Sequence, residues 1–535
     1  MPVKKYVIDS IDGGIQSAYN DAEPSQYLAG LGIDPDLPYR SSLAKTGGIL
    51  TPVAYSKFSG TEIDGYPLWI VTQPKTQNAF VYTTAGKLHS FDSVLAMRAT
   101  DEASTALPIT ITGGAGNGMV YYNNFIYLAE NADISQYGGM DQGASIAKTE
   151  NVWTGAKFGK TALTNTTYPT IRGTALPNHV MHLHTDNAVY VCDVLPTSGS
   201  TSGQGVIHKI KTTRTTIDGD TNDGSIYNAL DLPYGFLPTD IETAPDGTSL
   251  MISAIQSTGA SIDQGSACVF IWDTISDSFF HQFWMPDPFV TAMKNVNGVV
   301  YIFSGNNNAG ARASAYLGGQ TAEQIMFFEE GVSPFAGAVD AYGDRVSFGA
   351  YTTYPETTAS VFAFGSKDPR RPKALHNIAR ASTQGTTPIV TALKYVQQAS
   401  GITPRFAMGW GDDSNKGLDK LDGGGTHLSV FRKRFKIGRK FSIREISIPL
   451  VTSVSSGAII NVKIYVDAET TSFTLNAINN TNYSGKTRVV YKRPALTARG
   501  EHDFILELAW GGTDPKRVSL PIEIYVDEYD EESTA

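Results

Sequence analysis

Cysteine is scarce in this chain: its 535 residues contain two, Cys192 and Cys268. Each lies beside an apolar run with the pattern of a strand, residues 189–191 and 269–272. We therefore interpret both as buried thiols that act as small hydrophobic residues. A single disulfide between them is the alternative, although one bridge would be an unusual framework for a chain of this length.

Long apolar runs and an excess of positive charge are also missing. No stretch of about 18 apolar residues is present, so no transmembrane helix is expected, and residues 1–14 lack the apolar core of a signal peptide. Lys and Arg total 42 against 52 Asp and Glu, which gives a net charge of −10. Nucleic-acid binders are usually basic. The acidic balance therefore argues against nucleic-acid binding by the chain as a whole, but not against a local basic patch.

Catalytic sequence motifs are missing as well. The chain has no Gly-x-Ser-x-Gly nucleophile motif with partners, no Walker A phosphate loop and no His-Glu-x-x-His metal motif. The glycine-rich segment 113–118 has no strand-to-helix context, so we interpret it as a loop. Glycoside hydrolysis requires two carboxylates at a defined distance from each other. The sequence does not give this distance, so glycoside hydrolysis remains open. We predict no catalytic residue, no bound metal and no cofactor.

What the chain does have is turn-forming and aromatic residues. It contains 52 glycines and 26 prolines, aromatic residues make up 10% of it, and long stretches rich in Glu, Lys and Leu are missing. This composition is typical of many short strands joined by turns. We therefore predict an all-β fold, in a chain long enough for two or three domains.

A unit built from a tight turn and an apolar strand recurs along the chain. Asn-Gly and Asp-Gly pairs tolerate the positive φ angles that two-residue hairpin turns require. The turns recur about every 45 to 65 residues, a spacing that fits four-stranded propeller blades. They are Asp64-Gly65, Asn123-Asn124, Asp186-Asn187, Asp246-Gly247, Asn297-Gly298 and Gly343-Asp344.

These six units predict a β-propeller over residues 48–425. A seventh unit is indicated by the strand patterns at 389–396 and 405–410, completed by residues 417–421 or by an N-terminal strand that closes the ring. Closure matters because an open blade would expose the edge of its sheet. We predict seven blades, with six as the alternative.

The pattern of apolar and polar residues changes after residue 425. Apolar and polar residues alternate at 460–466, 504–510 and 522–526, and this period of two indicates antiparallel strands with one buried face. We predict a β-sandwich or jelly-roll-like domain over residues 426–535. Residues 1–47 are turn-rich and form a predicted N-terminal arm, which is either a surface extension or an arm that docks on a neighbouring subunit.

Two charged segments lie in the C-terminal domain. Residues 431–440 are densely basic and residues 527–532 densely acidic. We interpret both as solvated faces that protect sheet edges. The alternatives are a charge-complementary contact between subunits and, for the basic strand, contact with nucleic acid.

The run from His179 to Asp186 contains three histidines. On a strand, His182, His184 and Asp186 would share one face, and imidazoles suit zinc. Asp186, however, is needed in the turn with Asn187. We therefore favour a blade strand with outward-facing histidines over a metal site.

The loop from Asp218 to Asp223 resembles the start of a calcium-binding loop. That pattern needs Gly at the sixth position and Glu at the twelfth, where this chain has Asp223 and Ala229. We interpret the segment as a solvated loop, with a loose calcium site as the alternative.

Three segments carry a resemblance to a known family: residues 47–55 (GGILTPVAY), 410–420 (WGDDSNKGLDK) and 520–527 (LPIEIYVD). Together with the predicted architecture, they resemble the nozzle-type tail proteins of short-tailed bacteriophages. The resemblance implies a structural virion protein that forms a homo-oligomeric ring, a tail nozzle or tail hub, assembled in the host cytoplasm. It also implies contacts with other tail proteins and passage of DNA without specific binding, which an acidic surface favours. No catalytic residue transfers.

Two other functions remain open. A carbohydrate-binding or glycan-degrading propeller would act on host surface polysaccharide, with the sandwich as an accessory module. A cellular interaction scaffold is the third alternative, although the sequence has no WD or kelch signature.

Overall fold

We analysed a computed structural model of the chain. It describes residues 3–9, 14–15, 26–31, 49–50, 61–93, 95–101, 104, 106–111, 113–130, 133–138, 148–153, 179–195, 204–210, 226–256, 266–306, 310–328, 334–352, 358–365, 373–381, 389–396, 405–412, 415–421, 429–467, 472–492, 499–500, 502–514 and 516–529. In these residues the fold is almost entirely β, as predicted, and no helix among them is long and apolar enough to cross a membrane.

The first four blades are consecutive four-stranded antiparallel sheets. Their strands are β7 (Pro67–Thr72), β8 (Ala79–Thr83), β9 (Lys87–Phe91) and β10 (Ile109–Thr110) in blade 1; β11 (Met119–Tyr122), β12 (Phe125–Glu130), β13 (Asp133–Tyr137) and β14 (Lys148–Trp153) in blade 2; β15 (Met181–Leu183), β16 (Val189–Leu195), β17 (Gln204–Ile210) and β18 (Ile226–Asp231) in blade 3; and β19 (Phe236–Thr243), β20 (Leu250–Gln256), β21 (Ala267–Trp272) and β22 (His281–Trp284) in blade 4.

Three more blades complete the described propeller. Their strands are β23 (Phe289–Val296), β24 (Val299–Asn306), β25 (Gly310–Tyr316) and β26 (Glu323–Phe328) in blade 5; β27 (Val339–Tyr342), β28 (Arg345–Thr352), β29 (Thr358–Gly365) and β30 (Ala374–Arg380) in blade 6; and β31 (Ile389–Val396), β32 (Arg405–Gly411), β33 (Lys416–Leu421) and β6 (Thr61–Glu62) in blade 7.

The ring closes through its seventh blade. Strand β6 from the N-terminal side pairs with β33, and the inner strands β31 and β7 are in contact. The prediction of seven blades is confirmed, and both proposed closing segments are used, because 416–421 supplies the third strand and 61–62 the fourth. Closure in this way leaves no open end of the ring at which the inner strands would lack a neighbour.

Five of the six predicted turns join the first two strands of blades 2 to 6. Asn123 and Asn124 have φ values of 49° and 69°, and Asn297 and Gly298 have values of 52° and 83°, the left-handed geometry of a type I′ hairpin turn. The turn at Asp64-Gly65 differs from the prediction, because it links the closing strand β6 to the inner strand β7 and these strands do not pair with each other.

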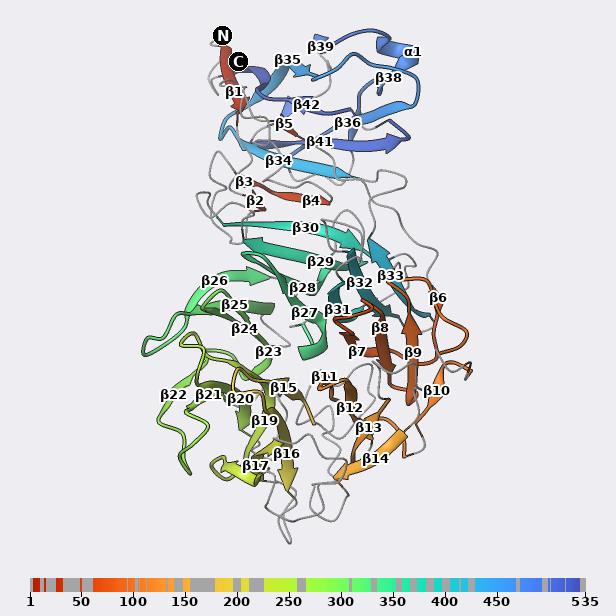
Figure 1. Cartoon of the computed structure of the whole chain (residues 1–535). Coiled ribbons are helices and arrows are strands. Elements are labelled where there is room, and N and C mark those ends of the chain that lie inside the picture. The colour runs from red at the N-terminus through yellow and green to blue at the C-terminus, as the bar shows by residue number, and fades with distance from the viewer. Residues whose placement is uncertain are drawn as a thin grey trace.

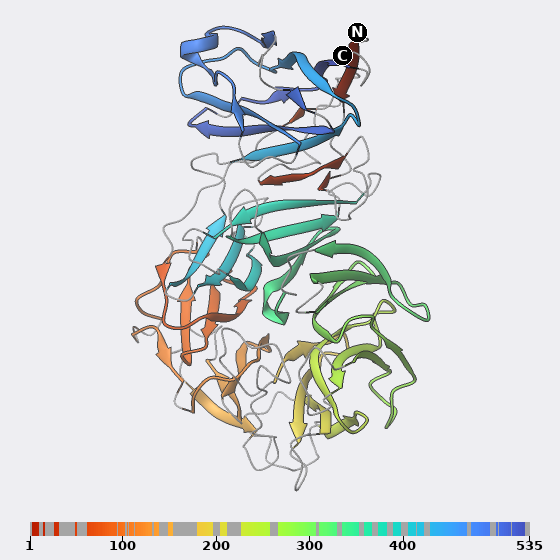
Figure 2. The same ribbon diagram turned by 180° about the vertical axis from the view of Figure 1, so that it is seen from behind.

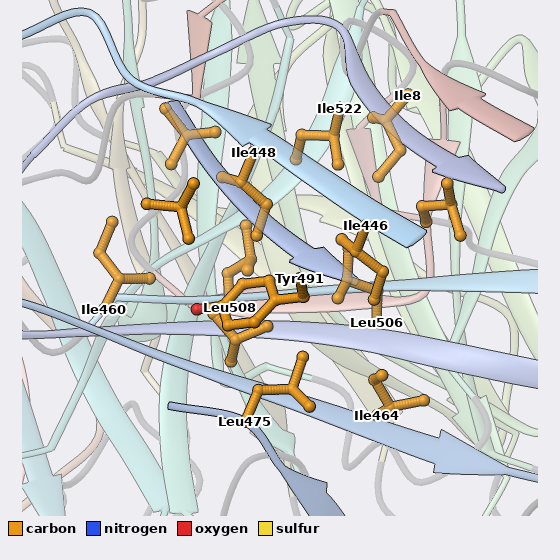
Figure 3. Close-up of a cluster of buried hydrophobic side chains, with 14 of the residues drawn as sticks. Ile8, Ile446, Ile448, Ile460, Ile464, Leu475, Tyr491, Leu506, Leu508 and Ile522 are labelled. Carbon is orange, nitrogen blue, oxygen red and sulfur yellow. The ribbon is translucent and has the colours of Figure 1, made fainter. Parts of the chain in front are cut away.

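The C-terminal domain is a sandwich of two sheets. One contains β35 (Phe441–Pro449), β39 (Arg488–Lys492), β40 (Arg499–Gly500) and β43 (Ile522–Glu528); the other contains β34 (Val430–Lys436), β36 (Ala458–Val466), β37 (Phe473–Thr474), β38 (Ile478–Asn479) and β41 (Asp503–Gly512). A single short helix, α1 (Asn480–Tyr483), occurs among the described residues of this domain. The predicted alternation is confirmed, since Ile460, Val462 and Ile464 are buried between the sheets, where they meet residues of both layers (Figure 3).

The N-terminal segment differs from the predicted arm, because its described strands belong to the sheets of both domains. Strand β1 (Val3–Ile8) pairs with β43, and β4 (Ala29–Leu31) pairs with β34, both in the sandwich. Strands β2 (Gly14–Ile15) and β3 (Gln26–Tyr27) extend the sheet of blade 6 beyond β30. Strand β5 (Ile49–Leu50) pairs with β42 (Val518–Ser519). The segment therefore runs from the sandwich to the propeller and back.

The two domains stack with blade 6 facing the sandwich. Strands β2 to β4 lie between β30 and β34, and both chain ends lie on the sandwich, away from the propeller (Figures 1 and 2). The side chain of Lys433 on β34 donates from Nζ to the carbonyl oxygen of Gln26 on β3, at 2.6 Å. The amide of Leu28 donates to the carbonyl oxygen of Arg432 at 2.9 Å. These hydrogen bonds connect the N-terminal segment to the sandwich, and the pairing of β2 with β30 connects it to the propeller.

Candidate functional site

One position recurs on the inner strand of each blade and lines the propeller axis. In every blade it follows a residue of the apolar series Ile70, Met119, Met181, Ile241, Met293, Val339 and Leu393, all of which are buried. Because side chains alternate along a strand, the next residue points away from that buried position. These next residues all line one cavity of about 360 Å³, which we call the channel. Together they form the ring of the channel: Val71, Val120, His182, Glu242, Lys294, Asp340 and Lys394.

Charges of opposite sign alternate around four blades of this ring, 4 to 7, and His182 of blade 3 lies beside the first of them. Nε2 of His182 lies 3.5 Å from Oε1 of Glu242, and Nζ of Lys294 lies 3.3 Å from Oε2 of the same carboxylate. In the next two blades, Nζ of Lys394 lies 3.1 Å from Oδ1 of Asp340. Each side chain comes from a different blade, so these contacts connect blades 3 to 5 and blades 6 to 7.

Burial and these neighbours shift the pKa values in the ring. Burial opposes ionisation of Glu242, but attraction to Lys294 and His182 outweighs it and holds the pKa of the carboxyl below its usual value. The same carboxylate raises the pKa of Lys294. Burial lowers the pKa of His182 despite Glu242. Glu242 and Lys294 are therefore charged at neutral pH, and His182 is neutral.

A second carboxyl, Asp240, lies two residues before Glu242 on β19. Its Oδ2 accepts from the amide of Met293 at 2.6 Å and its Oδ1 from its neighbour Ile241 at 2.8 Å, so it connects blade 4 to blade 5. Burial raises its pKa to about 7, even though both amides favour the ionised form. Asp240 therefore titrates near neutral pH.

The raised pKa of Asp240 leads us to predict that the stability of the protein depends on pH. Its pKa is about 7 in the folded protein against an ordinary 3.8, so between these values the folded state holds a proton that the unfolded state has lost. Stability from this group is therefore lost as the pH rises through this window. Between pH 4 and 7, the free energy of unfolding of Asp240→Asn should rise relative to that of the wild type by up to about 1.4 kcal/mol for each pH unit.

Urea unfolding of both proteins at pH 5 and pH 7.5 measures this gain. His182, Glu242 and Lys294 face Asp240 in both proteins, so their direct contributions cancel in the difference. A free-energy difference between variant and wild type that is the same at both pH values would contradict the assignment.

A 3₁₀ turn, η5 (Ala336–Ala338), contacts the inner strands of blades 5, 7 and 1. Ala336 and Gly337 line the channel cavity, and Oγ1 of Thr291 donates to the carbonyl oxygen of Pro334 at 2.6 Å. A Cβ atom on Gly337 would lie 2.1 Å from the carbonyl oxygen of Leu68. Only glycine allows this close approach of η5 to strand β7 of blade 1.

The predicted histidine run divides between two environments. Nε2 of His182 and Nδ1 of His184 both lie within 3.0 Å of Oγ1 of Thr243 on the next blade, and Asp186 accepts from the amide of Ala188 and the hydroxyl of Tyr190 in its turn. The three side chains therefore do not converge on one point. Among the described residues, no group of three or more His, Cys, Asp or Glu side chains could hold a metal ion.

His179, in contrast, belongs to a fully buried cluster inside blade 3. Nε2 of His179 and Nε2 of His208 each lie 3.1 Å from an oxygen of Asp193, whose Oδ1 also accepts from the amide of Val194. Burial alone would raise the pKa of Asp193, but His179 and His208 hold it far below its usual value. Because all three side chains are buried, this cluster holds β16 and β17 together and is not accessible to a substrate.

The basic strand β34 has its partners in the same sheet. The Nε atom of Arg432 lies 3.3 Å from Oε2 of Glu507 on β41, and Arg434 contacts Asp503. On the other sheet, Arg444 lies 3.7 Å from Asp527 of the acidic segment. In the described part of both segments, Arg432, Arg434 and Asp527 thus have their ionic partners within the same chain. The segment Asp218–Asp223, interpreted as a solvated loop with a loose calcium site as the alternative, lies outside the described residues.

Both cysteines are buried in the propeller, as free thiols. The interpretation of Cys192 and Cys268 as small hydrophobic residues is consistent with their packing in the cluster between blades 3 and 4. The sequence predictions did not include the charged ring of the channel. A signal for it exists in the repeated segments Thr291-Ala-Met-Lys294 and Thr391-Ala-Leu-Lys394, which place a lysine at the same point of blades 5 and 7.

Comparison with known proteins finds matches among solved structures. No protein-family model and no curated protein sequence matches the chain. Among solved structures, the chain is similar to the β-propeller domain of Cps50 (Swd1) from Myceliophteria thermophila, with a TM-score of 0.41 and 9% sequence identity, over 69% of this chain and 99% of that one. A likeness of this kind concerns the fold alone and carries no inference about function.

Proposed function

We propose that the chain is a structural subunit that assembles into a closed ring, as a nozzle or hub protein of a bacteriophage tail. The observation that carries the proposal is the N-terminal segment, which supplies strands to blade 6 and to both sheets of the sandwich. Backbone pairing on both sides thus connects the two domains through this segment. A subunit of a symmetric assembly needs such fixed geometry, because small changes of angle prevent a ring from closing.

The contacts of the charged side chains support a structural role. In the channel, Glu242 and Asp340 are each paired with a lysine, and in the sandwich the basic strand is paired with β41. Each of these three carboxylates is compensated by a basic neighbour within the same chain. Such compensation stabilises a scaffold, and among the carboxyl groups that line the channel Asp240 has a pKa near neutral pH.

The size of the channel bears on how DNA would pass. A cavity of about 360 Å³, part of whose wall is formed by η5, is far too small for a DNA duplex. We infer that DNA passes through the opening between several copies of the chain and not along the axis of one propeller. The net charge of −10 would keep DNA from adhering to the wall of that opening.

Mass photometry of the purified chain, alone and mixed with tail proteins encoded beside it, tests the proposal. We expect a closed oligomer of one defined size in at least one of these samples. Monomers in every sample would overturn it. In the same samples, retention of DNA at low salt should be weak, and tight retention would contradict the inferred role of the acidic surface.

The alternative is a propeller that binds or degrades host surface polysaccharide. Release of reducing ends from purified capsular polysaccharide measures degradation, and a glycan array measures binding. The structural proposal predicts no release of reducing ends. Release that is lost in Glu242→Gln or Asp340→Asn would instead assign catalysis to the channel.

A further inference from the structure

The channel wall presents ammonium groups more than carboxylates. The side chains of Lys294 and Lys394 are 29% and 32% exposed, whereas those of Glu242 and Asp340 are each 7% exposed. The carboxylates are therefore covered and the lysines reach the cavity. Each ammonium has three N–H groups, of which the contact with its carboxylate uses only part. A ligand in the cavity would thus meet two cationic hydrogen-bond donors.

The adjoining sector of the wall is apolar and aromatic. Blades 1 and 2 contribute Val71 and Val120 at the positions that carry charge elsewhere, and Trp69 and Tyr121 line the same cavity. The indole N–H of Trp69 donates to Oδ1 of Asn117 at 2.8 Å, and the Tyr121 hydroxyl donates to Oδ1 of Asn124 at 3.3 Å. The polar atoms of both aromatic residues thus have protein partners. Their rings pack in part against the core of blades 1 and 2, and the part that stays exposed can contact an apolar or ring-shaped group.

The cavity combines these two sectors at the size of a small molecule. A volume of about 360 Å³ lies at the lower end of the range for ligand pockets, in which a few placed polar groups accompany apolar walls. Since the ring residues come from all seven blades, the fold holds them in place before a ligand arrives. Such preorganisation reduces the entropy lost on binding.

We propose that the channel is a binding site for a carboxylate carried on a six-membered ring. The carboxylate would bind Lys294 and Lys394 through charge-assisted hydrogen bonds, and one face of the ring would pack on the apolar sector of blades 1 and 2. The site selects against cations, because the three carboxyl groups of the wall that would attract them, those of Asp240, Glu242 and Asp340, are covered. This inference does not depend on ring assembly, so either proposal can fail without the other.

Isothermal titration calorimetry on the full chain tests the site with two matched pairs of probes. Benzoate is compared with benzyl alcohol, and glucuronate with glucose, so that each pair differs mainly in the carboxylate. We expect at least one carboxylate to bind at least tenfold more tightly than its neutral counterpart, and its affinity to fall as salt is added. The pair that shows the larger difference distinguishes an aromatic from a sugar ligand.

Charge-neutral double variants locate the binding. Glu242→Gln with Lys294→Gln, and Asp340→Asn with Lys394→Gln, each remove one ion pair without leaving a lone charge, and each should weaken carboxylate binding at least tenfold. Asp186→Asn with Lys209→Gln removes a comparable ion pair, 2.8 Å apart in blade 3, that does not line the channel. This control should bind as the wild type does.

A third variant keeps the test decisive if the double variants do not fold. Val120→Phe fills the apolar sector and leaves every charge of the ring in place, so it should abolish binding of both ring carboxylates. Three results would overturn the proposal: equal binding of carboxylate and neutral counterpart in both pairs, unchanged carboxylate binding in Val120→Phe, or no binding of either carboxylate at concentrations up to tens of millimolar.

Discussion

Replacing Asp193 by alanine should lower the free energy of unfolding by about 3–5 kcal/mol, the cost of removing one partner of a buried charged group. The carboxylate of Asp193 lies between His179 and His208, and all three side chains are at most 1% exposed. Without it, two imidazoles and the amide of Val194 lose their acceptor inside blade 3. Each buried donor left unsatisfied costs about 1–3 kcal/mol.

Denaturant unfolding measures this loss. Asp231→Ala is the matched control, because Asp231 is exposed on strand β18 of the same blade, and a surface substitution of this kind usually changes stability by about 0.5 kcal/mol or less. The pKa of Asp193 lies far below its usual value, so its stabilising contribution should persist at pH 4 and be lost only as the pH falls well below that. A cost below about 1 kcal/mol for Asp193→Ala would show that the cluster is not structural.

Replacing Ile8 by alanine should destabilise the sandwich by about 2–5 kcal/mol. Ile8 is the last residue of β1 and is fully buried in the sandwich core, beside residues of β35 and β43 (Figure 3). Its loss leaves a cavity at a point where the N-terminal segment contributes to a core otherwise built from residues beyond 430. The effect should therefore equal that of a central core residue, although Ile8 is eight residues from the chain start.

The neighbouring residue supplies the control for this prediction. Val7 lies on the same strand but points to the opposite face and is 36% exposed, so Val7→Ala should change stability by about 0.5 kcal/mol or less. Differential scanning calorimetry of the two variants and the wild type gives the comparison. Equal effects of Ile8→Ala and Val7→Ala would mean that β1 is not part of the folded sandwich.

The propeller could be predicted from sequence because its turns have a strict backbone requirement. Residues such as Asn123-Asn124 and Asn297-Gly298 adopt positive φ at both turn positions, which few residue types tolerate. The sandwich was predictable for a different reason, since Ile460, Val462 and Ile464 alternate with polar residues on one two-faced sheet. In both cases a local pattern reports directly on local geometry.

The N-terminal strands left no comparable pattern. Of the six residues of β1, only Ile8 is buried, and strands β2 to β5 have two or three residues each. Strands this short are defined by the long-range partners β30, β34, β42 and β43, not by their own sequence. For this reason the segment was predicted as an arm, although its strands are built into both domains.

The charged ring of the channel escaped prediction because it is a property of seven strands taken together. Each blade contributes one residue, such as Lys294 or Asp340, and a single charged residue on a strand usually faces solvent. Only the closed ring brings them to one cavity. The histidine run was a more conspicuous sequence pattern, yet its three candidate ligands are held in separate hydrogen bonds.

Single-particle electron microscopy of the purified chain, with its neighbouring tail proteins where assembly needs them, tests the central claim most directly. The account predicts closed rings of identical subunits in which the propeller and the sandwich keep one fixed orientation, with the central opening between subunits and each propeller channel closed to DNA. Particles that remain single chains under all of these conditions, or whose two domains take variable orientations, would contradict it.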